Sequence, residues 1–435
     1  MTASAPEAAQ RRDVGLAGVV MFGTGTAIGV SIFTVLQPAA SVAGSGLLPA
    51  LLLAAAPMLL FAVTYAYLGS AVPVSGASYE WPRRFLHPFV GFLISWLRIL
   101  SNVGALTVLA LILVSYVGMV VALPLKPTMA VLLTVIFALN YIGVSVAAKV
   151  QNLLMVLLLA VFGVFVAGGL PQVDATVLTQ ALDAQPLAVL AAVPLMISLF
   201  LGIEAAVEIG EEVRQPRRNI PLGIALAIGL TALVYGLVSI TALGALGVEG
   251  LSASAAPLLE AAQVVLGSWA MPVIVAAAAV AILTSMNSIA LTFSRSLLAM
   301  GRAGAFPKAL GKIHPRFATP HRAVLAGYAL AMMGLLLPSS LIFLLLAVNI
   351  PTMMKYVACS LSAVRVAKAH PEVHARSSLG LSRRTAVLTG YLAAGCGLAI
   401  IAAGFQADWR PYALVAGWAV AGVVFWGLRR RFMAA

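Results

Sequence analysis

Charged residues are scarce in this chain. Only 9% of its 435 residues are Asp, Glu, Lys or Arg, against about 25% in an ordinary soluble protein. A soluble chain of this length would need a charged surface over two or three domains, so the composition excludes that class. Cysteine is scarce as well. Cys359 and Cys396 both lie in apolar segments, which excludes a disulfide scaffold, and we expect no disulfide-linked partner subunit.

Apolar residues are abundant and make up 62% of the chain. A membrane-spanning helix needs about 20 mostly apolar residues, and no stretch alternates with period two as the strands of a β-barrel do. The sequence therefore predicts an all-α polytopic membrane protein with twelve transmembrane helices. They are expected near 15–37, 47–69, 88–120, 128–143, 151–170, 187–208, 221–247, 262–297, 322–337, 341–364, 386–405 and 411–428.

The basic residues predict the orientation of these spans. With the N-terminus inside, Lys126 and Arg410 are the only basic residues in outside loops, and Arg98 and Lys355 fall within spans. The rest lie in inside loops and tails, so both termini should be cytoplasmic in a plasma or inner membrane. Topology and contact with anionic membrane lipids explain the net charge of +13 better than nucleic-acid binding does.

Two spans contain residues that weaken a helix. The first has Gly23, Gly25 and Gly29, which indicate either an unwound site for an anion such as a carboxylate or close helix packing through Gly25 and Gly29. The sixth has Gly202 beside Glu204, an intramembrane carboxylate. Interrupted segments at corresponding positions of two halves are typical of inverted-repeat transporters.

Four stretches carry a family resemblance. Residues 28–33 read IGVSIF, residues 73–79 read PVSGASY, residues 202–221 run from GIE to EEVRQPRRNIP, and residues 294–320 run from SR to HPRFATP. They resemble motifs of the amino acid–polyamine–organocation (APC) superfamily of secondary transporters, and of the amino acid permeases within it. The resemblance covers nearly the whole chain.

The resemblance implies an organisation for the whole chain. Two inverted five-helix repeats would occupy 15–170 and 187–366, with helices 11 and 12 at 384–428 and cytoplasmic tails at 1–14 and 429–435. The sequence departs from the family at three positions. Tyr67 stands where many members carry an acid. Ser31 replaces a glycine, and Leu158 stands where several members have a lysine that substitutes for a sodium ion, which speaks against lysine-based proton coupling.

The resemblance also implies a substrate site between the broken first and sixth helices. The backbone around Ile28, Gly29, Val30 and Ser31 would hold the substrate carboxylate. Carbonyl groups near Ser198, Leu199 and Phe200 would receive the amino group, Phe200 would act as a gate, and Gly202 would mark the second break. We expect no cofactor.

Four charged residues within spans are candidates for coupling. Glu204 is expected either to take up a proton or to form a hydrogen-bonded strut, and Glu208 to line the pathway or anchor a loop. Arg98 is expected to reach water or an interface, with a pairing to an acid or to substrate charge left open. Lys355 is expected to extend toward the cytoplasm, with a site role left open.

Polar residues in spans eight and ten are candidate pocket or ion-site residues. They are Ser285, Asn287, Ser288 and Asn349, and the alternative for them is hydrogen bonding between helices. All five histidines fall in predicted cytoplasmic loops, and the sequence has no HExxH, P-loop or GxSxG motif. We therefore expect neither a metal site nor an enzyme.

Together these features predict a secondary active transporter that moves neutral or apolar amino acids by alternating access, with proton coupling left open. The alternatives are an amino acid or polyamine exchanger or exporter without proton coupling and, from other classes, a channel or a substrate-sensing receptor. Neutral substrates are favoured because the spans contain no acid beyond Glu204 and Glu208, and a dicationic polyamine would require more negative charge.

Overall fold

The protein is described by a computed structural model. The structure describes residues 12–28, 31–118, 121–142, 144–174, 176–254, 256–336, 341–405 and 409–434. Within these ranges the chain forms α-helices, short 3-10 helices and turns, with two isolated backbone bridges in place of strands. The α-helices are α1 Leu16–Ala27, α2 Ser31–Ala43, α3 Leu47–Ala71, α4 Ala77–Phe85, α5 Pro88–Gly118, α6 Leu125–Ile142, α7 Val144–Gly169, α8 Thr176–Leu182, α9 Pro186–Ile197, α10 Pro216–Ala253, α11 Pro257–Leu266, α12 Ala270–Arg302, α13 His321–Gly334, α14 Leu341–Ala369, α15 Pro371–His374, α16 Arg383–Phe405 and α17 Arg410–Ala434.

Nine helical stretches among the described residues are long and apolar enough to cross a membrane. They include α5, α6 and α17, whereas α9 and α13 have only 12 and 14 residues. This confirms a multi-pass helical membrane protein and leaves the count of twelve spans a prediction. The apolar segment expected at 262–297 is divided, because α11 and a 3-10 turn at Gly267–Trp269 precede the longer α12.

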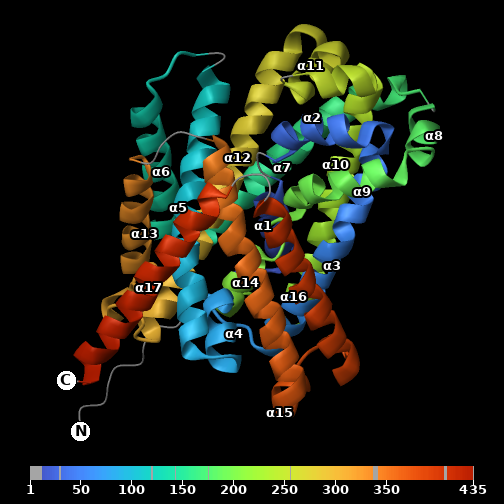
Figure 1. Cartoon of the computed structure of the whole chain (residues 1–435). Helices are drawn as coiled ribbons and strands as arrows, with labels where there is room; N and C mark the ends of the chain where they lie inside the picture. The colour runs from blue at the N-terminus through green and yellow to red at the C-terminus, as the bar shows by residue number, and fades with distance from the viewer. Residues whose placement is uncertain are drawn as a thin grey trace.

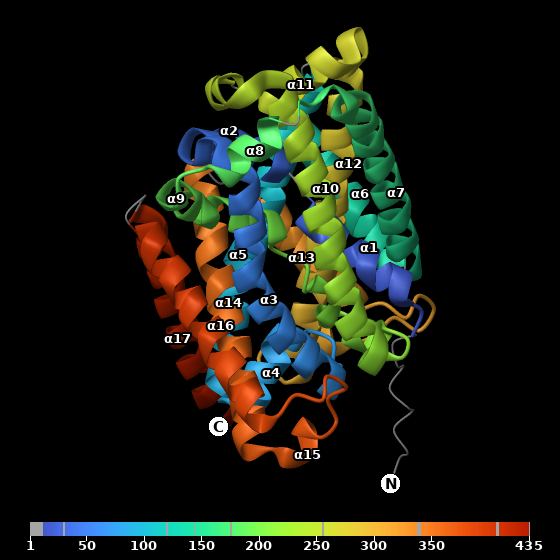
Figure 2. The ribbon, with the colours of Figure 1, turned by 90° about the vertical axis from the view of Figure 1, so that its right-hand side faces the viewer.

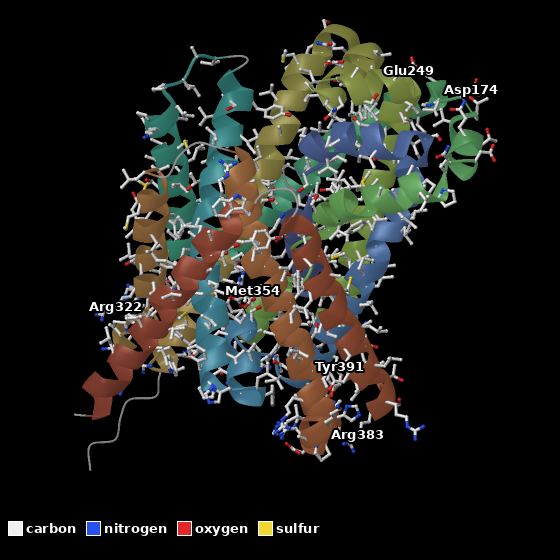
Figure 3. All side chains as sticks on the ribbon, viewed as in Figure 1. Asp174, Glu249, Arg322, Met354, Arg383 and Tyr391 are labelled. Carbon is white, nitrogen blue, oxygen red and sulfur yellow. The ribbon has the colours of Figure 1, made fainter. Side chains whose placement is uncertain are left out.

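The helices form an elongated bundle with two distinct ends. In Figures 1 and 2, α8 and α11 lie at one end, and α4 and α15 lie at the other. Figure 3 shows the acidic side chains of Asp174 and Glu249 at the α11 end. Arg322 and Arg383 lie toward the opposite end.

Packing at the centre of the bundle brings distant parts of the sequence together. Helix α14 packs on α5 and α16, α10 packs on α1 and α3, and α12 packs on α5 and α7. The apolar cluster between these helices includes Ile28, Leu158, Phe200 and Tyr356, all fully buried. Exposed leucine and valine side chains remain on the outer faces of α3, α7 and α17, where a membrane helix meets lipid rather than water.

Candidate substrate and coupling site

The first span is interrupted close to the middle. Helix α1 ends at Ala27, the capping residue Ile28 has φ −78° and ψ 71°, and α2 begins at Ser31. The predicted weak region began at Gly23, but Gly23 and Gly25 both lie inside α1. Gly29 and Val30 lie outside the described residues. Ile28 is fully buried and Ser31 is half-buried.

The sixth span is interrupted more extensively than the sequence indicates. Helix α9 ends at Ile197, and Ser198–Phe200 forms a 3-10 turn in which Leu199 and Phe200 are buried. No α-helix resumes at Glu204. Glu204 is the N-cap of the 3-10 helix Ala205–Glu208, and a second 3-10 turn, Gly210–Glu212, precedes α10. We call residues 204–212 the acidic segment, because it contains Glu204, Glu208, Glu211 and Glu212.

The two interruptions lie against each other. Gly202 has φ 102°, and a Cβ atom at this position would lie 2.6 Å from Cγ2 of Thr26 in α1. A Cβ atom on Gly23 would lie 2.7 Å from the carbonyl oxygen of Ile203. Glycine is therefore required on both sides of this contact, by backbone conformation at Gly202 and by space at Gly23. The close approach brings the end of α1 next to the turn that follows α9.

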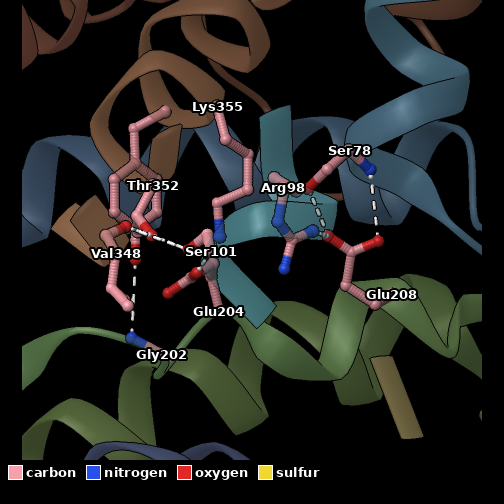
Figure 4. Close-up of polar contacts among 10 residues, drawn as sticks. Ser78, Arg98, Ser101, Gly202, Glu204, Glu208, Val348, Thr352 and Lys355 are labelled. Carbon is pink, nitrogen blue, oxygen red and sulfur yellow. Dashed lines mark hydrogen bonds and ion pairs between the residues drawn. The ribbon is translucent and has the colours of Figure 1, made fainter. Parts of the chain in front are cut away.

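Glu204 is paired with Lys355. The Nζ atom of Lys355 in α14 donates to Oε1 of Glu204 at 2.6 Å, and the two side chains are 5% and 4% exposed (Figure 4). The expectation that Lys355 extends toward water is therefore wrong. The sequence offered one signal for this pair. Leu158 stands where several family members have a lysine, and in this chain Lys355 of α14 supplies a positive charge to the acidic segment.

Arg98 is paired with Glu208 rather than with Glu204. Its Nη1 atom donates to Oε1 of Glu208 at 3.0 Å, so the expectation that Arg98 reaches water is also wrong. The hydroxyl and backbone N–H of Ser78 in α4 donate to the same carboxylate (Figure 4). Glu208 thus joins α5 and α4 to the acidic segment. Sequence reasoning missed Ser78, although it lies in the PVSGASY motif.

A third buried pair fixes the end of the acidic segment. Nε of Arg295 in α12 lies 2.9 Å from Oε1 of Glu212, and both side chains are almost fully buried. Burial raises the pKa of the Glu212 carboxyl, and Arg295 opposes that shift by lowering the pKa. The backbone N–H of Val14 donates to the carbonyl of Glu212 at 3.1 Å, and that of Arg214 donates to Val14 at 2.8 Å. Sequence reasoning did not select this pair.

The polar candidates of spans eight and ten have different surroundings. The Ser285 hydroxyl donates to the carbonyl of Gly25 at 3.2 Å, which joins α12 to α1 near the first interruption. Asn287 accepts a hydrogen bond from Asn140 of α6 at 3.0 Å. Ser288 is buried on α12, and Asn349 is half-buried on α14. Among the described residues, no group of three or more His, Cys, Asp or Glu could hold a metal ion.

A helical, multi-pass chain with paired interruptions at its centre is typical of a membrane transporter. Comparison with known proteins makes the class specific. The sequence model described as amino acid permease matches residues 14–428, so the chain belongs to the amino acid permease family. The prediction of an APC-superfamily amino acid permease is confirmed, and the chain is a transporter and not an enzyme.

Three relatives illustrate the range of this family. An uncharacterized transporter of Mycobacterium tuberculosis is 35% identical over 315 residues, which cover 72% of this chain and 71% of the relative. The branched-chain amino acid permease of Bacillus subtilis is 26% identical over 401 residues, covering 86% and 84%. The cadaverine/lysine antiporter of Escherichia coli is 31% identical over 126 residues, covering 29% and 28%.

Proposed function

We propose that this protein is a secondary active transporter that moves neutral, apolar amino acids across the cytoplasmic membrane by alternating access. The observation that carries the proposal is the contact between the two interruptions, where Gly202 meets Thr26. The similarity to a branched-chain amino acid permease supports an apolar substrate. The transporter would have twelve spans, with inverted repeats at 15–170 and 187–366, two further helices at 384–428 and cytoplasmic tails.

The positions of three charged side chains support this orientation. Basic side chains such as Arg383 lie toward the α4 and α15 end, which would face the cytoplasm, and Asp174 and Glu249 lie at the other end. Anionic lipids would contact the basic end.

The substrate would bind to backbone groups at both interruptions. Residues 28–31 would receive its carboxylate, because the start of a half-helix carries the positive end of the helix dipole. Carbonyl groups near Ser198, Leu199 and Phe200 would accept the hydrogen bonds of its amino group. The buried ring of Phe200 would close over the substrate.

Uptake by purified protein in liposomes tests the proposal. We expect leucine, isoleucine and valine to accumulate and to compete with one another, and we expect the Phe200→Ala variant to take them up with a raised KM. The control is Phe89→Ala, which removes a half-buried ring on α5 away from the interruptions. Uptake confined to polyamines or basic amino acids would contradict the substrate assignment.

The coupling candidates are Glu204, Glu208, Arg98 and Lys355, and Glu204 is the first of them. A carboxylate beside the substrate site would take up a proton in one orientation of the transporter and release it in the other.

A second function, amino acid exchange without protons, is favoured by one observation. Lys355 already supplies Glu204 with a positive charge at 2.6 Å.

Counterflow with and without a pH gradient separates the two functions. For a proton symporter, an inward proton gradient accelerates uptake, and Glu204→Gln abolishes that acceleration. For an exchanger, counterflow is independent of the gradient and requires substrate on both sides. Glu211→Gln is the matched control, because Glu211 belongs to the same segment but is about a third exposed, with its side chain 34% accessible.

A further inference from the structure

The ammonium group of Lys355 lies in a cage of one carboxylate and two aromatic rings. Its Nζ atom is 2.6 Å from Oε1 of Glu204, 4.4 Å from the centre of the Tyr356 ring and 5.9 Å from the centre of the Tyr65 ring. A carboxylate together with aromatic faces is the set of groups that proteins use to bind organic ammonium ions. The cage therefore has the chemistry of an ammonium site, and a side chain of the protein occupies it.

The walls of this cage are held by their own neighbours. The Tyr356 ring stacks on Phe61 with ring centres 4.7 Å apart, and the Tyr65 ring meets Trp81 edge to face at 5.7 Å. Both tyrosines are fully buried. Because α3, α4 and α14 fix these rings, removal of the Lys355 side chain would leave the rings and the Glu204 carboxylate in position.

The pair is not explained by stability alone. Moving a lysine and a glutamate out of water costs several kcal/mol per ion, and well-packed apolar residues of similar volume are often as stable. Lys355 also lies within a helix whose other lysine, Lys368, is exposed near its end. A buried, paired charge in a membrane-spanning segment is a functional candidate by default.

The cage adjoins the proposed substrate site. The backbone N–H of Gly202, at the second interruption, donates to the Tyr356 hydroxyl at 3.4 Å, and Glu204 follows Gly202 by two residues (Figure 4). A substrate held at the interruption with a second ammonium group on its side chain would have that group directed to a carboxylate nearby. In this protein the Glu204 carboxylate is already bound to Lys355.

We propose that Lys355 is a specificity-determining residue that fills an ammonium subsite and thereby excludes basic amino acids and diamines. This inference rests on the proposed transport function and extends it to substrate charge. The Lys355 charge neutralises Glu204 and repels a second cation, so the site admits amino acids whose side chains are uncharged. Without Lys355 the same cage would bind an alkylammonium group.

Chemical rescue of the Lys355→Ala variant tests the inference without any transport measurement. The deletion leaves room for three methylene groups and an ammonium, which n-propylammonium matches. We expect n-propylammonium to raise the thermal unfolding temperature of purified Lys355→Ala by several degrees, because a ligand that binds the folded state stabilises it. Wild type, Lys368→Ala and the Lys355→Ala/Glu204→Gln double variant should show no such rise, nor should Lys355→Ala with 1-propanol.

A second measurement addresses substrate choice. In liposomes, we expect wild type to take up leucine and to ignore lysine and cadaverine, and we expect Lys355→Ala to bind both cations. A folded Lys355→Ala protein that n-propylammonium does not stabilise more than wild type would overturn the inference. If that variant does not fold, Lys355→Ser, which is similarly short and keeps a hydrogen-bond donor, is tested in the same way with ethylammonium. Amine rescue with no leucine uptake in wild type would support the cage and contradict the proposed function.

Discussion

The guanidinium of Arg98 and the carboxylate of Glu208 meet at 3.0 Å inside the helix bundle, although 110 positions separate them in the chain. The Glu208 carboxylate also accepts hydrogen bonds from Ser78, so α4, α5 and the acidic segment converge on one group. Three of the four acids of this segment are buried and each has a cation from a different helix: Lys355 of α14, Arg98 of α5 and Arg295 of α12.

Removing one member of the Arg98–Glu208 pair should be costly. We expect Arg98→Met to lower the free energy of unfolding in mixed micelles by about 3–5 kcal/mol, because it leaves a buried carboxylate without its cation. The double variant Arg98→Met/Glu208→Gln should recover much of this loss. The matched control is Arg302→Met, whose pair with Glu211 is about a third exposed and should contribute less than about 1 kcal/mol. Equal losses for Arg98→Met and Arg302→Met would contradict the prediction.

A side chain at the second interruption should impair transport. In Gly202→Ala the Cβ atom meets Thr26 at 2.6 Å and the residue keeps a left-handed φ, which costs about 1–3 kcal/mol. We expect uptake to fall by about tenfold or more, since about 1.4 kcal/mol corresponds to a factor of ten in rate. Gly229→Ala is the control, because a Cβ atom there has no heavy atom within 4 Å. Wild-type uptake rates for Gly202→Ala would show that the close approach is dispensable.

Sodium should have no effect on transport. The Ser285 hydroxyl donates to the carbonyl of Gly25, and Asn287 accepts a hydrogen bond from Asn140. Both candidate ion ligands therefore already form hydrogen bonds to other helices of the bundle. Leu158 contributes no ligand at the fifth-helix position and is fully buried. We therefore expect initial uptake rates to be equal in sodium and potassium media at constant pH and membrane potential. A rate that rises with sodium and saturates would identify a sodium site.

Labelling from one side of the membrane tests the orientation. In a background of Cys359→Ser and Cys396→Ser, Asp174→Cys and Arg383→Cys place single thiols on exposed residues of opposite ends. We expect a membrane-impermeant maleimide to label Asp174→Cys in intact cells and to label Arg383→Cys only in inside-out vesicles. The reverse pattern would invert the proposed topology, and labelling of both in intact cells would contradict it.

The sequence predicts the helical class and the family from composition and motifs, and it selects Gly202 and Glu204 as unusual within an apolar span. It does not predict the partner of Glu204, because Lys355 is 151 residues away and tertiary packing alone brings them together. Nor does it predict that residues after Glu204 avoid the α-helix. Backbone contacts from Val14 to Glu212 and from Gly76 to Glu208 hold that segment in 3-10 turns, and such tertiary contacts override local propensity.

The spacing of the ion pairs along the chain has a consequence for biosynthesis. Glu208 pairs with a cation that is synthesised earlier, because Arg98 precedes it in the chain. Arg295, the partner of Glu212, is synthesised 83 residues after it, and Lys355, the partner of Glu204, is synthesised 151 residues after it. Until α14 emerges from the ribosome, the Glu204 carboxylate has no partner in the bilayer, where an unpaired charge is expensive. The centre of this transporter is therefore completed only when α14 has been inserted, and a chain that stops before α14 lacks the charge that the acidic segment requires.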